Sequence, residues 1–168
     1  MRTLAVIAAC CALGAGAAGA ASSSPALAHC GPGQLKLTGT LQGATQSLLG
    51  TLTVTNQSGR ACGLPGWPSR VALRTGTQVL PALTVHMSPK LEPPGLPTRK
   101  LPAHERVSVG IQWRNWCGVP RGRVRLSVSL AIYSAAPRTK VGVVRTPVCV
   151  DHKYSSRVAV SRFKISLL

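Results

Sequence analysis

Apolar and polar residues alternate one by one over most of the chain. An alternation of period two is typical of β-strands, whose successive side chains point to opposite faces, whereas the three-to-four spacing of an amphipathic helix is scarce here. In the clearest run, from Val124 to Ile132, each apolar residue is followed by an arginine, a serine or an alanine. Similar runs occupy residues 34–41, 48–56, 70–74, 83–87, 107–113, 141–150 and 158–168.

The breaks between these runs predict turns and one long irregular segment. Residues 43–46 are expected to join the first two runs as a hairpin, and Asn56-Gln57-Ser58-Gly59 predicts a turn after the second. Residues 88–102 hold five prolines, which exclude a helix or a central strand and predict a long loop or an irregular edge. A change of phase near Ser161 and Arg162 predicts a β-bulge.

About eight short strands with one apolar face each favour an all-β fold built from two packed sheets. A closed barrel is the structural alternative. At this length about two thirds of the surface of the unfolded chain can be buried, which is enough for one core. We therefore expect residues 29–168 to form a single β-sandwich domain.

The first 28 residues have the features of an export signal. Arg2 precedes an apolar, alanine-rich run from Leu4 to Ala21, and Ala26-Leu27-Ala28 offers the small residues that signal peptidase accepts. Cleavage after Ala28 would make His29 the first residue of the mature chain. The alternatives are a retained membrane anchor and a lipoprotein modified at Cys30. No second apolar run reaches bilayer-spanning length, so we expect no transmembrane span in the mature chain.

The cysteine count agrees with export. Two of the six cysteines belong to the leader, and the four that remain are Cys30, Cys62, Cys117 and Cys149. An even number in an exported chain predicts two disulfides, for which three pairings are possible. The register of the first hairpin brings Cys30 toward Cys62, which leaves Cys117 with Cys149. Each loop of about 32 residues would add roughly 3 to 4 kcal/mol of stability through chain entropy. No close pair of cysteines with the spacing of a thiolate metal site occurs.

The charge balance is strongly positive. Twenty lysines and arginines stand against three acidic residues, which gives a formal net charge of +17 and an isoelectric point near 11.3. The acids Glu92, Glu105 and Asp151 are far apart in sequence. They are poorly suited to a paired-carboxylate glycosidase, a carboxylate-rich Ca²⁺ or Mg²⁺ site, or a two-metal nuclease.

Basic residues gather in the second half of the chain and provide the candidate binding site. Arg121, Arg123 and Arg125 would project from one face of a strand about 6 to 7 Å apart. The full set of candidate anion-binding residues is Arg121, Arg123, Arg125, Arg157, Arg162 and Lys164. Such residues attract anionic envelope polymers or lipid headgroups. The alternative is an ordinary solvated surface that reflects base composition. Aromatic residues do not interleave with the arginines, so no specific nucleic acid is expected as a partner.

Catalysis and cofactors find little support in the sequence. A G-x-S-x-G nucleophile motif is absent, so we expect no enzyme and no cofactor. One metal hypothesis is open, because an amino-terminal His29 could bind copper together with His86, His104 or His152. Against it, Cys30 follows immediately and is expected to tie the terminus into a disulfide.

The three tryptophans have different expected roles. Trp113 is in phase with the apolar residues of its run and is expected in the core. Trp116 is out of that phase and could pack on the disulfide or face solvent. Trp67 lies in the turn-rich block from Cys62 to Pro68, and we expect it to cap the end of the sandwich, with an exposed ligand platform as the alternative.

Several of these blocks together resemble a known family. They are Leu52 to Asn56 leading into Cys62-Gly63-Leu64-Pro65-Gly66-Trp67-Pro68, Val107 to Trp113, Asn115-Trp116-Cys117-Gly118 and the late Cys149. In this combination the chain resembles the exported actinobacterial domain of unknown function 4232, over nearly all of its mature length. The resemblance implies an immunoglobulin-like sandwich that is secreted or attached to the cell envelope, and it assigns no catalytic or ligand residues.

Together these features predict a secreted, non-enzymatic β-sandwich that acts as a binding or structural module at the cell envelope. The partner expected from charge is an anionic polymer or a lipid surface. The alternative is a protein-interaction domain whose partner is recognised by the proline-rich residues 88–102 and by Trp67, with the charge incidental.

Overall fold

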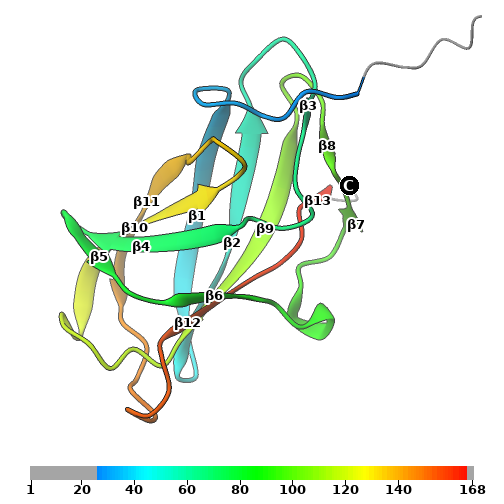
Figure 1. Cartoon of the computed structure of the whole chain (residues 1–168). Coiled ribbons are helices and arrows are strands. Elements are labelled where there is room, and N and C mark those ends of the chain that lie inside the picture. The colour runs from blue at the N-terminus through cyan, green and yellow to red at the C-terminus, as the bar shows by residue number, and fades with distance from the viewer. Residues whose placement is uncertain (1–25, 166–168) are drawn as a thin grey trace, which may run out of the picture.

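The computed structural model describes residues 26–165, which form thirteen strands and one 3₁₀ turn (Figure 1). The predicted leader therefore lies almost entirely outside the described residues. The elements in chain order are β1 (Leu35–Ala44), β2 (Ser47–Asn56), β3 (Cys62–Gly63), β4 (Arg70–Thr75), β5 (Gln78–Leu80), β6 (Leu83–His86), η1 (Pro89–Leu91), β7 (Leu96–Pro97), β8 (Lys100–Leu101), β9 (Arg106–Arg114), β10 (Arg123–Ala131), β11 (Arg138–Arg145), β12 (Arg157–Val160) and β13 (Lys164–Ile165). In this part of the chain no helix is long and apolar enough to cross a membrane.

Two sheets make up the body of the molecule. The larger one has the strand order β1-β2-β9-β12-β6, with β13 and β7 continuing from β9, and the smaller one has the order β11-β10-β4-β5. A separate two-stranded ladder joins β3 to β8. Among residues 26–165 no ladder links the two main sheets. The predicted sandwich is therefore confirmed, and the alternative of a closed barrel is wrong.

The strand order is that of an immunoglobulin-like sandwich with added strands. In immunoglobulin domains the second strand pairs with the first and the fifth, and the sixth pairs with the third and the seventh in the opposite sheet. Here β1, β2 and β9 form the first group, and β4, β10 and β11 form the second. The main addition is β12, which lies between β9 and β6 and runs parallel to β6. Strands β13 and β7 also continue from β9, and β5 extends the smaller sheet beyond β4.

The first hairpin has the predicted register and turn. Leu35 pairs with Asn56 at its open end and Ala44 with Ser47 at its closed end. Gln46 takes the left-handed conformation in the connecting turn, with φ of 60°. The backbones approach closely at Gly50, where a Cβ atom would overlap a carbonyl oxygen of β1.

The inward faces of the two sheets form one core. Trp113 is fully buried, as predicted, and its indole nitrogen donates to Ser156 Oγ at 2.8 Å. Trp116 is also buried, so of the two positions open to it from sequence, the solvent-facing one is wrong. Its ring lies 5.5 Å from that of Trp113, and its indole nitrogen donates to the Pro120 carbonyl at 2.7 Å.

Both predicted disulfides are present. Cys30 is bonded to Cys62, which ties the segment before β1 to β3. Cys117 is bonded to Cys149, which ties the segment after β9 to the segment after β11. Residues 88–102 form the predicted irregular edge, which contains only η1 and the two-residue strands β7 and β8.

The predicted bulge near the end of the chain is also present. Val160 pairs with Ile111 and Lys164 pairs with Ser108, so four steps along the last strands match three along β9. Between them, Ser161 N donates to the Gly110 carbonyl at 3.0 Å. The extra residue reverses which side chains face the core after β12.

Candidate anion-binding face

Arginines and one lysine cover the outer face of the smaller sheet. Along β10, Val124 and Leu126 are buried, whereas Arg123 and Arg125 point outward and are exposed. Strands β4 and β11, which flank β10, contribute further basic residues opposite its outward positions. We call this surface the basic face, and its residues are Arg70, Arg74, Arg123, Arg125, Arg138, Lys140 and Arg145.

A β-bulge places the basic residues of β11 on this common face. Leu126 pairs with Gly142 and the next residue of β10 pairs with Lys140, so Val141 is the extra residue. Gly142 has φ of 96°, a conformation that glycine adopts readily. In a regular strand, Lys140 and Arg145 would lie on opposite faces because they are an odd number of positions apart. The bulge corrects the phase, and Arg145 comes to lie directly opposite Arg123.

Few negative charges are available to neutralise the basic face. The chain has three acidic residues, and none of them lies in β4, β5, β10 or β11. Within residues 26–165 the only ion pair joins Lys164 to Glu92, outside this sheet. Neighbouring strands are about 4.8 Å apart and alternate residues about 6 to 7 Å apart. Seven cationic groups at these spacings produce a positive potential over the whole outer face.

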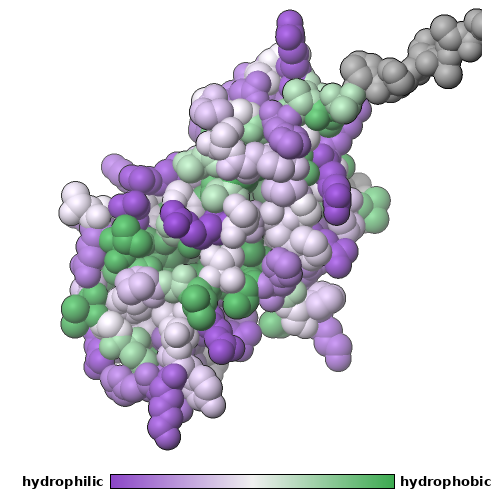
Figure 2. Space-filling model, in the orientation of Figure 1, coloured by the Kyte–Doolittle hydropathy of each residue, from purple (hydrophilic) through white to green (hydrophobic). Residues whose placement is uncertain are grey.

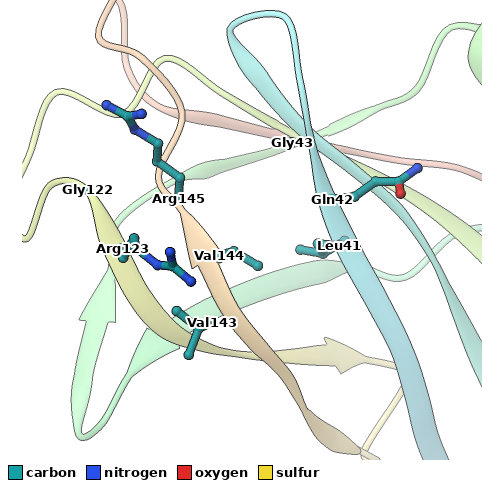
Figure 3. Close-up of a pocket in the computed structure, with 8 residues that line it drawn as sticks. All are labelled: Leu41, Gln42, Gly43, Gly122, Arg123, Val143, Val144 and Arg145. Atoms are coloured by element: carbon teal, nitrogen blue, oxygen red, sulfur yellow. The ribbon is translucent and has the colours of Figure 1, made fainter.

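Two shallow hollows on either side of Val143 shape this surface. The first, of about 540 Å³, opens between β1 and the ends of β10 and β11. Figure 3 shows Leu41 and Val144 facing each other across it, with Arg123 and Arg145 on the β10–β11 side. The second, of about 490 Å³, is lined by Arg125, Arg138 and Lys140, together with Gly76, Leu126, Ser127, Gly142 and Val143. Each hollow therefore combines at least two cationic groups with an apolar floor.

The structure separates the six residues proposed from sequence into different places. Arg123 and Arg125 lie on the basic face. Arg121 precedes β10, and its guanidinium donates to the carbonyls of Cys117 and Gly118 at 2.9 and 3.3 Å. Arg157 is exposed on β12, in the other sheet. Five members of the basic face were not predicted from sequence, and these are Arg70, Arg74, Arg138, Lys140 and Arg145.

The expectation that Lys164 is exposed beside Arg162 is wrong. Lys164 pairs with Ser108, an outward residue of β9, but residues 92–95 cover it, so it is buried whereas Arg162 is exposed. The Lys164 ammonium group lies 3.0 Å from a carboxylate oxygen of Glu92 and donates to the Pro93 carbonyl at 2.8 Å. It is therefore engaged in holding the proline-rich segment and is not available to an external anion.

Trp67 is partly covered by its neighbours. Its ring stacks on that of His86 with centroids 4.4 Å apart, and the Arg162 guanidinium lies 4.8 Å from the ring centroid. Its indole nitrogen is buried and has no hydrogen-bond partner. The packing expected for a cap is present, but Trp67 retains intermediate exposure.

The histidines do not provide a clear metal centre. His29 is exposed and stacks on Tyr133, with ring centroids 3.7 Å apart. Within the described residues, the only group of three potential metal ligands is His152 with the two sulfurs of Cys117 and Cys149, and these sulfurs are bonded to each other. These two cysteines therefore supply no thiolate that could bind a metal.

These features define a disulfide-bonded β-sandwich with one strongly cationic sheet face. The chain belongs to the family described as Domain of unknown function (DUF4232), whose sequence profile matches residues 30–164. No curated protein and no solved structure gives a significant match.

Proposed function

We propose that this protein is an exported, non-enzymatic module that holds an anionic polymer of the cell envelope, or a surface of anionic lipid headgroups, on its basic face. The observation that carries the proposal is the gathering of seven cationic side chains on one sheet face without a carboxylate among them. The two disulfides support an oxidising, extracellular location. The apparent leader at residues 1–28 supports export to the envelope.

A linear polyanion suits this face better than a single small ion. The cationic groups are spread over three strands, so one small anion could contact only a few of them. A chain of repeating phosphates or carboxylates could contact many at once and would release its condensed counterions on binding. Binding should therefore be of low specificity and should weaken steeply with rising salt.

The test compares two variants of equal net charge. The triple variant R123Q/R125Q/R145Q removes charge from the basic face, and the control R60Q/R99Q/K100Q removes three exposed charges elsewhere. Affinity for linear inorganic polyphosphate and for vesicles containing phosphatidylglycerol would be measured at several salt concentrations. For polyphosphate, we expect the first variant to bind more weakly and its log K against log salt slope to fall by about 2 to 3, because each lost phosphate contact contributes roughly 0.7 to 0.9.

The control variant should bind both probes nearly as well as the wild type. Equal losses in the two variants would mean that only total charge matters, and the assignment to this face would then be wrong. Retention that does not respond to salt, or no retention at all, would refute polyanion binding.

The second candidate function is protein recognition through the proline-rich segment and Trp67. The observation that favours it is the exposed apolar surface there, with Leu91 and Leu96 both more than half exposed. Figure 2 also shows apolar surface among hydrophilic side chains over β5 and β6, where Val79 and Leu83 are exposed. A protein partner captured from envelope extract by the wild type and the R123Q/R125Q/R145Q variant, but lost by W67A, would favour this function.

A further inference from the structure

A third hollow, of about 790 Å³, lies on the outer face of the larger sheet. Its floor is formed by outward residues of β9, β12 and β6, and includes Gln112, Arg114, Arg157 and Ala159. The turn at residues 45–47 and residues 150–155 form its walls. A hollow of this size is in the range of sites for small organic ligands.

The wall formed by residues 150–155 is held firmly in place. Asn115, which directly follows β9, accepts hydrogen bonds from the amides of Val150 and Asp151 at 2.9 and 3.1 Å. Its side-chain amide donates to the carbonyls of Asp151 and Tyr154 at 2.9 and 2.6 Å. The disulfide at Cys149 anchors the same segment on its amino-terminal side. The hollow is thus formed before any ligand arrives, which lowers the entropic cost of binding.

Two arginines lie directly opposite each other in this floor. Arg114 pairs with Arg157 across the ladder between β9 and β12, so their side chains leave the same face of the sheet side by side. Gln112 Oε1 accepts a hydrogen bond of 2.6 Å from Arg114 Nη2, which orients that guanidinium. Like charges placed directly opposite each other destabilise a sheet. In the described part of the chain neither arginine forms an ion pair.

The surroundings of the two arginines provide an apolar surface and a single carboxylate. The adjacent row of the floor, about 6 to 7 Å along the strands, carries Ala159 and Val85. Val150 and Tyr154 add further apolar surface from the wall. Asp151 is the only carboxylate in the lining, and one of its oxygens already accepts a hydrogen bond from the Lys153 amide at 2.8 Å.

We propose that this hollow binds a small organic carboxylate. The carboxylate would lie between the Arg114 and Arg157 guanidinium groups, which match its planar geometry and remove their mutual repulsion. The apolar body of the ligand would cover Val85 and Ala159. This site lies on a different sheet and uses different residues from the basic face. The proposal can therefore be tested, and refuted, independently of polyanion binding.

The probe is octanoate, followed by chemical-shift changes in amide NMR spectra of the disulfide-bonded protein. We expect saturable changes centred on residues 112–115, 150–159 and 85–86, whereas octylammonium should produce none. Octyl phosphate serves as a second anion and shows whether the site prefers a carboxylate to a phosphate group. Stronger binding of octyl phosphate than of octanoate would overturn the assignment to carboxylates.

The variant R114Q/R157Q should bind octanoate at least about tenfold more weakly, because it loses charge-assisted hydrogen bonds. The control R123Q/R125Q removes the same charge from the basic face and should bind as the wild type does. If the double variant does not fold, the single variant R157Q replaces it, since Arg157 is exposed. Unchanged affinity in the arginine variant, changes centred on the basic face, or no saturable change at millimolar octanoate would refute the proposal.

Discussion

Replacement of Asn56 by alanine should destabilise the fold far more than its small size suggests. Asn56 is fully buried at the end of β2. Its side-chain amide donates to the carbonyls of Arg60, Leu101 and Pro102 at 2.7, 3.3 and 3.0 Å. Its oxygen accepts hydrogen bonds from the amide and the hydroxyl of Ser58 at 2.9 and 2.7 Å. One side chain thus holds the turn after β2 and the segment before β9 together.

The magnitude follows from the number of groups that lose a partner. Each hydrogen bond contributes about 1 kcal/mol net, and a buried group left without a partner costs about 1 to 3 kcal/mol. The groups of Ser58 and Arg60 can reach water, whereas the Leu101 carbonyl is buried. We therefore expect N56A to lower the free energy of unfolding by about 3 to 5 kcal/mol. For a domain of this size that corresponds to a fall in Tm of roughly 10 to 15 °C.

The assay is urea and thermal unfolding of the disulfide-bonded protein, followed by circular dichroism. Q57A is the matched control, because Gln57 is the exposed neighbour and its side chain forms no hydrogen bond with any of residues 26–165. Q57A should remain within about 0.5 kcal/mol of the wild type. A loss of less than 1 kcal/mol in N56A would show that this hydrogen-bond cluster does not stabilise the fold as we reason.

Three further predictions test other parts of the structure. G50A should lower the free energy of unfolding by more than about 2 kcal/mol, because its new methyl group would overlap the backbone of β1, whereas G43A, in open space, should be nearly neutral. E92Q should cost about 2 to 4 kcal/mol by leaving the buried Lys164 ammonium without its ion pair, and adding K164M should recover much of that loss in a double-mutant cycle. N115A should increase amide hydrogen exchange across residues 150–155 much more than in the two main sheets, since it removes the hydrogen bonds that hold this segment.

The alternation of apolar and polar residues was sufficient to predict the main strands and one disulfide partner for each cysteine. Period two fixes which side chains face the core, and the hairpin between residues 34 and 56 fixes where Cys30 and Cys62 meet. The same rule does not show what covers an outward residue. Lys164 pairs with the outward Ser108 of β9, but it is buried because Glu92 and Pro93 of the proline-rich segment pack over it.

The candidate sites depend on which strands lie side by side. The alternation of residues within a single strand does not indicate its neighbours. Arg145 joins Arg123 only through the register of β10 with β11 and through the bulge at Gly142, and a glycine inside an alternating run was the only local signal of it. The facing of Arg114 and Arg157 requires β12 to lie beside β9. Nothing in the sequence of either strand indicates that neighbour, because the connections that decide it are long.

The position of β12 has a consequence for the order of events in folding. The only ladder of β6 in the described chain is with β12, and it pairs Leu83 with Arg157. This edge of the sheet therefore cannot form until β12 is available. Pairing of such distant segments raises contact order and slows folding. We therefore expect the larger sheet to close late, only after nearly all of these residues have been synthesised.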